Sequence, residues 1–332
     1  MKAKARDPGV HPSVVARAQP EGEAPSAMPS HPERRFATPA DLRVALAATY
    51  IADDRTSLVT WLALAMQKPL LLEGPPGVGK TDLARALAET LGRPLLRLQC
   101  YEGLDESKAL YEWDYAKQIL YCELLREAAL ERTRGSPSLA EAIEASGADE
   151  AFFSERFLVA RPLLQAIESP VPVVLLVDEV DRSDPELEAF LLEMLAENQV
   201  TIPELGRRSA AHPPLVLLTT NGTRDMTDAL RRRCLHLFLD HPPPSRELEI
   251  LRLRLPGIDA TLAAAVVRFV GDLRSLGLRK PPSIAETIDW ARALVLLGAG
   301  ALSPSLVRDT MGLLLKHEED LRAGEAATAR LT

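Results

Sequence analysis

Cysteine is scarce in this chain, and the cysteines that occur are far apart. The 332 residues include three, Cys100, Cys122 and Cys234, too few and too scattered for a disulfide framework or a zinc site. We therefore expect a reducing compartment, in which each cysteine is a small buried side chain. The six histidines show no ligand spacing either, so we expect no structural metal.

Long apolar runs and a surplus of basic residues are also missing. The best apolar run, Ala293–Leu302, is interrupted by glycines and falls short of the roughly 18 residues that a membrane span needs. The basic start of the chain lacks an apolar h-region, so we expect no secretory signal and a cytoplasmic protein. A net charge of −8 argues against broad nucleic-acid binding, which needs a basic face, but leaves a local basic patch open.

Large apolar residues are rare in the first 36 positions, which contain six prolines and charges of both signs. Such a segment cannot bury enough surface to offset the entropy of ordering, so we expect residues 1–36 to be a disordered, proline-rich tail. Residues 135–150 are polar and small, which predicts a surface insertion of unassigned role. The chain as a whole is 46% hydrophobic and 26% charged, an ordinary globular composition for one large or two unequal domains.

Apolar runs alternate with helical patterns from residue 37 onward. Short apolar runs bounded by turn residues predict buried strands at 69–73, 94–99, 171–178, 215–220 and 235–239. Helices are predicted after Thr38, from Lys80, and over 55–66, 116–132 and 185–198. Buried strands separated by helices indicate an α/β fold whose parallel sheet is covered on both faces.

The strand signal disappears after the proline triplet at 242–244. Only helical patterns follow, at 246–253, 259–276, 283–297 and 303–315. We therefore expect an α/β domain over residues 37–243, a small all-helical domain over 244–318 and a C-terminal tail over 319–332.

The segment from Leu70 to Asp82 reads LLLEGPPGVGKTD, an apolar run followed by G-x-x-x-x-G-K-T and a helical pattern. This order of strand, glycine-rich turn and helix is the context of a nucleotide phosphate site. Lys80 can reach the β- and γ-phosphates, the Thr81 hydroxyl can ligate Mg²⁺, and the helix adds free N–H groups. We expect ATP with Mg²⁺, held by Gly74, Pro75, Pro76, Gly77, Val78, Gly79, Lys80, Thr81 and Asp82. The alternative, a turn that binds nothing, does not explain the full spacing.

Polar side chains end two further apolar runs. Asp178 and Glu179 follow one strand about a hundred residues beyond the glycine-rich loop, and Asn221 follows the next. Ligands of open α/β sheets bind at the carboxyl ends of the strands. Asp178 can therefore hold Mg²⁺, Glu179 can polarise an attacking water, and Asn221 can orient that water or touch the γ-phosphate.

Three arginines, 231–233, precede the last predicted strand. They are either a solvated basic cluster or a source of an arginine for a nucleotide. If these arginines lie on the flank opposite the glycine-rich loop, they cannot reach a nucleotide bound at the loop of the same subunit. An oligomer with sites between subunits is then required.

These segments, in this order and before an all-helical lid, resemble the AAA+ ATPases over roughly residues 38–316. The resemblance implies a P-loop αβα domain with Gly74–Thr81 as Walker A, Val173–Glu179 as Walker B and Asn221 as sensor 1. Arg233 then matches the arginine finger, with Arg232 as second choice. The segments LQCYEGLDESKALYEWDYAKQILY, VDEVDRSDPELEAFLLEMLAENQVTIPEL and TDALRRRC are most similar to the MoxR group, in particular its CoxD-like branch.

The MoxR resemblance implies a ring, commonly of six subunits, that hydrolyses ATP and remodels a protein client. It also implies a von Willebrand factor A-domain partner, and the CoxD-like branch implies maturation of a molybdenum hydroxylase of the carbon monoxide dehydrogenase type. In that group, residues 199–204 form a β-hairpin. One departure is that the helix expected at 283–297 starts without the sensor-2 arginine of AAA+ lids. Only Arg279 and Lys280 precede it.

Two questions stay open on the sequence alone. The aromatic window 101–121 contains four of the five tyrosines and one tryptophan, at 101, 111, 113, 115 and 121. These side chains either contact a partner or pack helices onto the sheet. A nucleic-acid motor or clamp-loader-like ATPase is the alternative function, which the net charge disfavours.

Overall fold

The structure is a computed structural model that describes residues 35–121, 123 and 153–328. The predicted tail lies outside the described residues except for its last two positions. So do the insertion predicted at 135–150 and most of the helix predicted at 116–132. The boundary expected between residues 243 and 244 stays a prediction, because the described residues belong to one unit of the chain, Arg35–Thr332.

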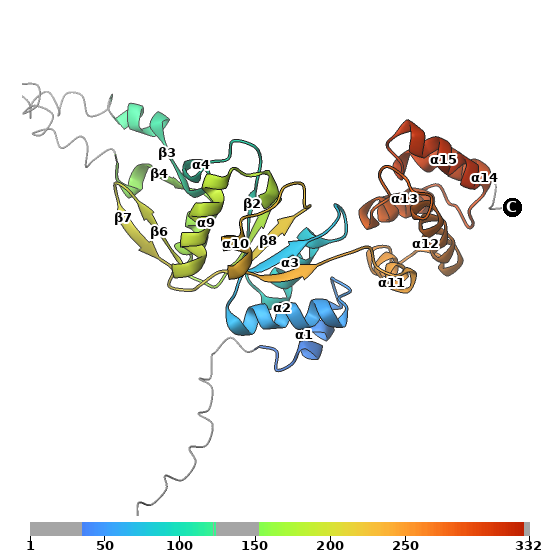
Figure 1. The fold of residues 1–332 in the computed structure, drawn as a ribbon, viewed down its shortest axis with the longest axis horizontal. Coiled ribbons are helices and arrows are strands. Elements are labelled where there is room, and N and C mark those ends of the chain that lie inside the picture. The colour runs from blue at the N-terminus through green and yellow to red at the C-terminus, as the bar shows by residue number, and fades with distance from the viewer. Residues whose placement is uncertain (1–34, 122, 124–152, 329–332) are drawn as a thin grey trace, which may run out of the picture. The chain divides into compact units, whose positions relative to one another are not determined.

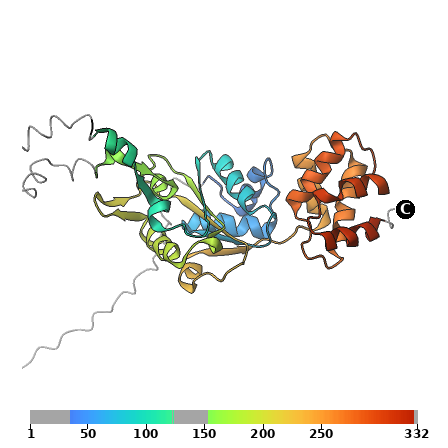
Figure 2. The ribbon, with the colours of Figure 1, turned by 90° about the horizontal axis from the view of Figure 1, so that it is seen from above.

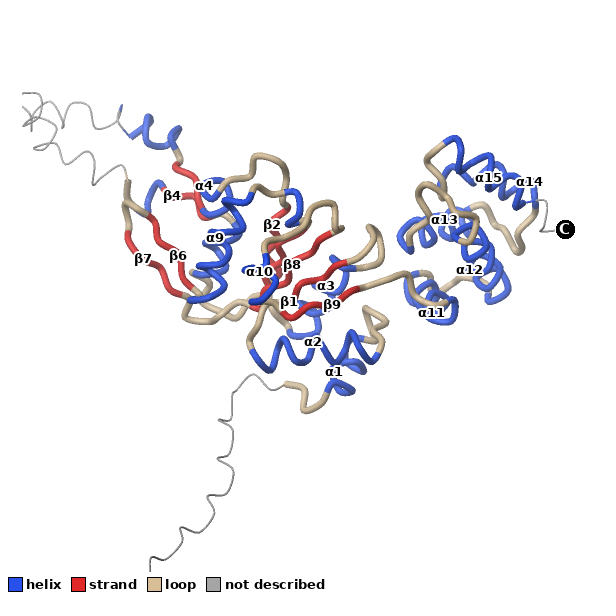
Figure 3. Tube along the Cα trace, in the orientation of Figure 1, coloured by secondary structure: helices blue, strands red, loops and turns tan. Residues whose placement is uncertain are grey.

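A five-stranded parallel sheet forms the centre of the α/β part (Figures 1 and 3), as the alternation of strands and helices predicts. Its order is β2-β5-β8-β1-β9, and every pair of neighbours is parallel. The two most buried strands, β5 and β8, read VLLVD and LVLLTT. The strands are β1 (Leu70–Glu73), β2 (Leu95–Gln99), β5 (Val174–Asp178), β8 (Leu215–Thr220) and β9 (Leu235–Phe238).

Helices cover both faces of this sheet (Figure 2). Alternate residues of each strand point to opposite faces, so the apolar strands present an apolar surface on each side that helices bury. Leu176 of β5 packs in a core with α1, α2 and α3, whereas Leu175 of the same strand packs in a second core with α8, α9 and α10. The three-layer αβα arrangement predicted from the sequence is thus confirmed. The helices are α1 (Pro39–Leu46), α2 (Asp54–Met66), α3 (Lys80–Leu91), α4 (Glu106–Leu110), α8 (Pro162–Ile167), α9 (Pro185–Glu197) and α10 (Asp228–Arg233).

Two antiparallel strand pairs extend the α/β part. β6 (Gln199–Ile202) pairs with β7 (Gly206–Ser209), which confirms the hairpin expected at 199–204 and continues it to Ser209. β3 (Tyr111–Trp113) pairs with β4 (Leu158–Ala160), which follows the 3₁₀ turn η1 (Glu155–Phe157). The β3–β4 pair was not predicted, because its three-residue strands are far apart in the sequence and carry no local turn signal.

The part after residue 243 is helical, as predicted. It has a core of its own around Trp290, which is fully buried and donates a hydrogen bond of 2.8 Å from Nε1 to Thr310 Oγ1. The elements are α11 (Pro244–Arg254), α12 (Ala260–Arg274), α13 (Ile284–Leu296), α14 (Pro304–Thr310), η3 (Met311–Leu313) and α15 (Glu318–Thr328).

Helix α15 occupies a segment for which the sequence predicts a tail. It packs through small residues, since a Cβ on Gly324 would lie 2.6 Å from Met311 Sδ. Its buried Asp320 accepts hydrogen bonds from the backbone N–H groups of Arg279 (2.8 Å) and Lys280 (3.2 Å). A helix docked through glycine and alanine lacks the large apolar stripe that sequence patterns detect.

No helix within the described ranges is long and apolar enough to cross a bilayer.

A buried ion pair joins three of the C-terminal helices. Glu247 of α11 accepts hydrogen bonds from Arg274 of α12 at 2.6 and 2.8 Å and from the Thr287 hydroxyl of α13 at 3.0 Å. Arg274 also donates from Nε to the carbonyl oxygen of Pro282, 2.8 Å away. The pair therefore fixes the segment that leads into α13.

Replacing Arg274 by methionine should destabilise the protein by about 3–5 kcal/mol, because the buried Glu247 carboxylate loses its counter-charge. The measurement is the free energy of unfolding in urea at pH 7. Arg322→Met, which removes an exposed arginine, is the control and should cost less than about 1 kcal/mol. Equal losses in the two variants would contradict this assignment.

Candidate active site

The glycine-rich loop turns sharply between the end of β1 and the start of α3. Gly74, Gly77 and Gly79 have φ values of +154°, +76° and +98°, which side chains rarely adopt. A Cβ on Gly74 would lie 1.9 Å from the carbonyl oxygen of Leu239, so this backbone approach also requires glycine. Gly79 is the N-cap of α3 and makes no side-chain cap. Gly79 therefore leaves the first backbone N–H groups of α3 without a side-chain cap, and such N–H groups can bind an anion.

Lys80 is the first residue of α3, and only 7% of its surface is exposed. Its Nζ donates hydrogen bonds to the carbonyl oxygens of Gly74 (2.6 Å) and Pro75 (2.8 Å) and to Asn221 Oδ1 (2.9 Å). Burial lowers the pKa of Lys80, and the neighbouring carboxylates of Asp181, Asp178 and Glu179 oppose this shift. The ammonium group thus lies at the glycine-rich loop, amid three acids.

Thr81 and Asp178 meet where α3 begins and β5 ends. The Thr81 hydroxyl lies 3.2 Å from each oxygen of the buried Asp178 carboxylate. A hydroxyl and a carboxylate at this point are hard oxygen donors of the kind that Mg²⁺ prefers. The residues present therefore fit a magnesium ion.

Arg97 also contacts Asp178, which the sequence analysis missed. It donates to Asp178 Oδ2 from Nε (3.0 Å) and Nη2 (2.6 Å). The sequence does mark Arg97 as unusual, because it is an arginine between the leucines of β2. Its partner could not be named without knowing that β2 and β5 are neighbours.

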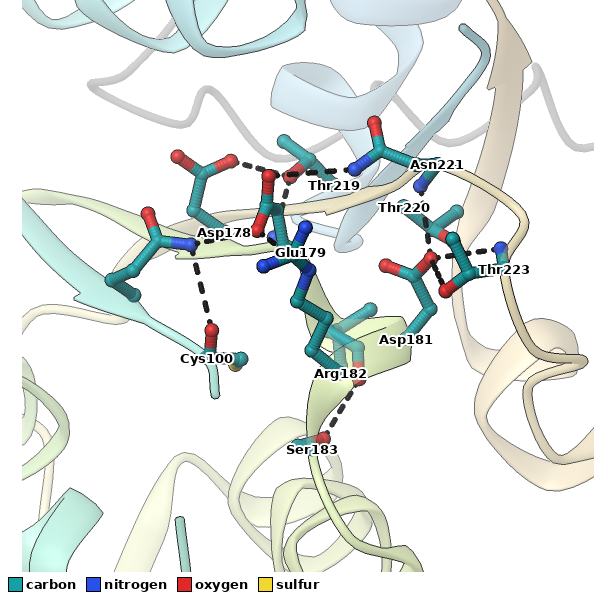
Figure 4. A network of polar contacts seen from close by, with 12 residues as sticks. Cys100, Asp178, Glu179, Asp181, Arg182, Ser183, Thr219, Thr220, Asn221 and Thr223 are labelled. Atoms are coloured by element: carbon teal, nitrogen blue, oxygen red, sulfur yellow. Dashed lines mark hydrogen bonds and ion pairs between the residues drawn. The ribbon is translucent and has the colours of Figure 1, made fainter. Parts of the chain in front are cut away.

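Glu179 follows β5 in a left-handed conformation, with φ 57° and ψ 49°. Its backbone N–H donates to Thr219 Oγ1 at 2.8 Å (Figure 4). Its carboxylate accepts hydrogen bonds from Gln99 Nε2 (3.3 Å) and Asn221 Nδ2 (3.4 Å) and forms an ion pair with Arg182 (3.0 Å). Left-handed backbone at a non-glycine residue is rare and is often found at functional sites.

Asn221 joins Lys80 to Glu179. Its side-chain oxygen accepts from Lys80, and its side-chain nitrogen donates to Glu179. This arrangement brings together Lys80, Thr81, Asp178, Glu179 and Asn221, which the sequence analysis took from three separate segments.

Asp181 holds the backbone of the same loop (Figure 4) and was not predicted. Its Oδ2 accepts hydrogen bonds from the N–H groups of Asn221 (3.2 Å) and Thr223 (3.0 Å) and from the Thr223 hydroxyl (2.6 Å). Burial raises the pKa of Asp181, but these hydrogen bonds outweigh it, so that the net shift is downward. Asp181 is therefore a charged anchor for Asn221.

The arginines of α10 lie outside this cluster. Arg231 comes within 3.9 Å of Glu73, at the end of β1. Arg232 and Arg233 are exposed, and neither side chain forms an ion pair or hydrogen bond with another described residue. The structure thus leaves both predicted finger residues free on the surface of the described chain.

A cavity of about 390 Å³ lies beside the glycine-rich loop, within the size range of small-ligand sites. Arg254 and Arg292 line it, from α11 and from the later part of α13, and Arg254 lies 3.2 Å from Asp82. Arg279 and Lys280, which precede α13, do not line it. The helical part therefore supplies Arg254 and Arg292 to this cavity. It does not supply Arg279 or Lys280, which precede the helix expected to carry sensor 2.

The aromatic window divides into two groups. Trp113 packs edge-to-face against Tyr111 and Phe153, with ring centroids 5.7 and 5.3 Å apart. Tyr101 and Tyr115, by contrast, are 50% and 60% exposed. Packing thus accounts for part of the window only.

Comparison with known proteins places residues 69–234, half of the chain, in a match to the AAA domain family, dynein-related subfamily. NorQ of Paracoccus denitrificans is 24% identical over 64% of this chain and 67% of its own length. The gas vesicle ATPase GvpN of Haloferax mediterranei is 26% identical over 68% of this chain and 61% of its own length. The solved RuvB Holliday junction branch migration motor of Thermotoga maritima has a TM-score of 0.42 and 18% identity, over 79% of this chain and 69% of that one.

Gly74→Ala should weaken nucleotide binding strongly, because the added Cβ forces the loop away from Leu239 and moves the carbonyl groups that hold Lys80. The measurement is titration with a fluorescent ADP analogue, for which we expect at least a tenfold weaker affinity. Gly312→Ala is the control, since Gly312 has open space around its Cα. Unchanged binding by Gly74→Ala would show that the loop tolerates the side chain.

Proposed function

We propose that this chain, which belongs to the AAA domain family (dynein-related subfamily), is a Mg²⁺-dependent ATPase of the MoxR type that remodels a protein client. The observation that carries the ATPase proposal is the link from Lys80 through Asn221 to Glu179, beside the Thr81–Asp178 pair. Two relatives, NorQ and GvpN, support the MoxR type, and GvpN is itself named an ATPase.

Each side chain receives one role in this proposal. Residues Gly74–Asp82 surround the phosphates, and Lys80 contacts the β- and γ-phosphates. Thr81 and Asp178 would hold Mg²⁺, which when bound neutralises charge on the phosphate oxygens. Glu179 accepts a proton from the attacking water, and Asn221 keeps the Glu179 carboxylate aimed at that water.

Arg232 and Arg233 complete the site from a neighbouring copy. The side chains of both are exposed and unpaired within the described residues. Arg231 of the same helix lies 3.9 Å from Glu73, at the end of β1. An arginine supplied to the γ-phosphate is worth roughly 10³–10⁵ in rate. We therefore propose a ring, with six subunits as the number implied by the MoxR resemblance.

The client is proposed to be a protein. The MoxR resemblance points to a von Willebrand factor A-domain partner and, through the CoxD-like branch, to a molybdenum hydroxylase of the carbon monoxide dehydrogenase type. The net charge of −8 supports a protein client over nucleic acid. The exposed Tyr101 and Tyr115 supply aromatic contact area for it.

Glu179→Gln should lower ATP turnover by roughly 10²–10⁴-fold while ATP binding stays within about twofold, because the amide cannot take the proton. Lys80→Ala should lose binding itself. Steady-state phosphate release and nucleotide titration separate the two effects. Glu186→Gln, an exposed change on α9, is the control. Turnover by Glu179→Gln at the wild-type rate would remove Glu179 from the mechanism.

The ATP-bound Glu179→Gln protein should retain a client that the ADP-bound form releases. The measurement is co-purification with a molybdenum hydroxylase and a von Willebrand factor A-domain protein, with ATP or ADP. Binding to DNA is measured in parallel at 50 and 200 mM salt. ATPase activity stimulated by DNA, with no retained protein, would favour a nucleic-acid motor instead.

A further inference from the structure

Glu188 on α9 is a fully buried carboxylate, with 0% of its surface exposed, to which the proposed mechanism assigns no role. A buried charge is costly unless it is paired and hydrogen-bonded. Both of its oxygens have partners in the loop between β8 and α10. Oε1 forms an ion pair with Arg224, and Oε2 accepts a hydrogen bond of 3.0 Å from the Thr227 N–H.

The second of these contacts sets the start of the arginine helix. Thr227 is the N-cap of α10, and its hydroxyl accepts a hydrogen bond of 3.4 Å from the Leu230 N–H. Leu230 is fully buried in the core that contains α9. Glu188 therefore holds α10 at its N-cap residue, Thr227, and the buried Leu230 holds it in the core. Arg232 and Arg233 stay exposed at the other end of the helix.

The first contact connects the same loop to the stretch that follows Glu179, the proposed general base. Arg224 donates to Glu188 and also to the carbonyl oxygen of Ser183, 3.0 Å away, which follows Glu179 by four residues. Asp181 holds the preceding residues Asn221 and Thr223. Two carboxylates from the stretch after β5 thus hold the loop from Asn221 to Thr227 at both ends.

We propose that Glu188 is a positioning residue that orients α10, so that Arg232 and Arg233 reach the nucleotide of the neighbouring subunit. This inference rests on the proposed ATPase function. The pairing of Glu188 with Arg224 gives the loop one low-energy position, because any other position leaves a buried carboxylate without its partners. Asp181 holds Asn221 of the chain's own site, whereas Glu188 holds the end of the loop that starts α10, so Glu188 is assigned to the neighbour's site.

Glu188→Gln tests this, because glutamine keeps the side-chain length but loses the charge that pairs with Arg224. We expect kcat to fall roughly 10–100-fold, as for a misplacement of about 1 Å, with nucleotide affinity close to the wild-type value. The melting temperature should fall, because Arg224 loses its counter-charge. Glu193→Gln is the matched control, since Glu193 lies on the same helix and is exposed. It should hydrolyse ATP at the wild-type rate.

Mixed rings show on which site Glu188 acts. Lys80→Ala subunits lack a working nucleotide site but present intact arginines, whereas Arg232→Ala/Arg233→Ala subunits have the reverse defect. Glu188→Gln should regain activity when mixed with Lys80→Ala and gain none when mixed with the double arginine variant. The readout is phosphate release against the mixing ratio.

Several outcomes would overturn the inference. These are wild-type turnover by Glu188→Gln, loss of its nucleotide binding, rescue by the double arginine variant, or rescue by neither partner. Full activity of the double arginine variant alone would overturn it too. A wild-type protein that binds ATP but never hydrolyses it would instead overturn the proposed function, and the inference with it.

Discussion

The hydrogen bonds of Asn221 to Lys80 and Glu179 are the contacts on which the candidate site depends. They join residues that are 141 and 42 positions apart in the chain. Such contacts require that β1, β5 and β8 end at the same edge of the sheet. The order β5-β8-β1 satisfies this requirement, because β8 lies between β1, which leads into the loop before Lys80, and β5, which Glu179 follows. Sheet order is thus the constraint that turns three separate motifs into one site.

The α/β class, the αβα layers and the helical C-terminal part could be predicted because each depends on a local pattern. Apolar runs such as Val174–Val177 and the glycine-rich turn before Lys80 are visible in a few consecutive residues. The same holds for the ends of the strands, where Asp178 and Asn221 stand out against apolar neighbours. The roles assigned to these side chains stay predictions that the proposed experiments test.

The features that escaped prediction depend on distant partners. Arg97 contacts Asp178 only because β2 and β5 are neighbours, and the β3–β4 pair joins segments on either side of residues 114–157. Glu188 looks like any acid on a polar helix face until its burial beside Arg224 and Thr227 is seen. Helix α15 docks mainly through small residues such as Gly324 and Ala327, so its buried face offers few large apolar residues to a sequence pattern. In each case a pairwise contact, and not a local propensity, decides the structure.

The position of β1 in the sheet also has a consequence for the order in which the protein folds during synthesis. β1 pairs with β8 and β9, so the strand before the glycine-rich loop has no neighbour in the sheet until the ribosome has made β8, residues 215–220. Contacts this distant in sequence close slowly, since a long chain segment must be ordered first. A nascent chain that ends before β8 contains the whole glycine-rich loop, Asp178 and Glu179, yet it lacks the strand that lies between β5 and β1. The glycine-rich loop, Asp178 and Glu179 therefore come together only in chains that already contain β8.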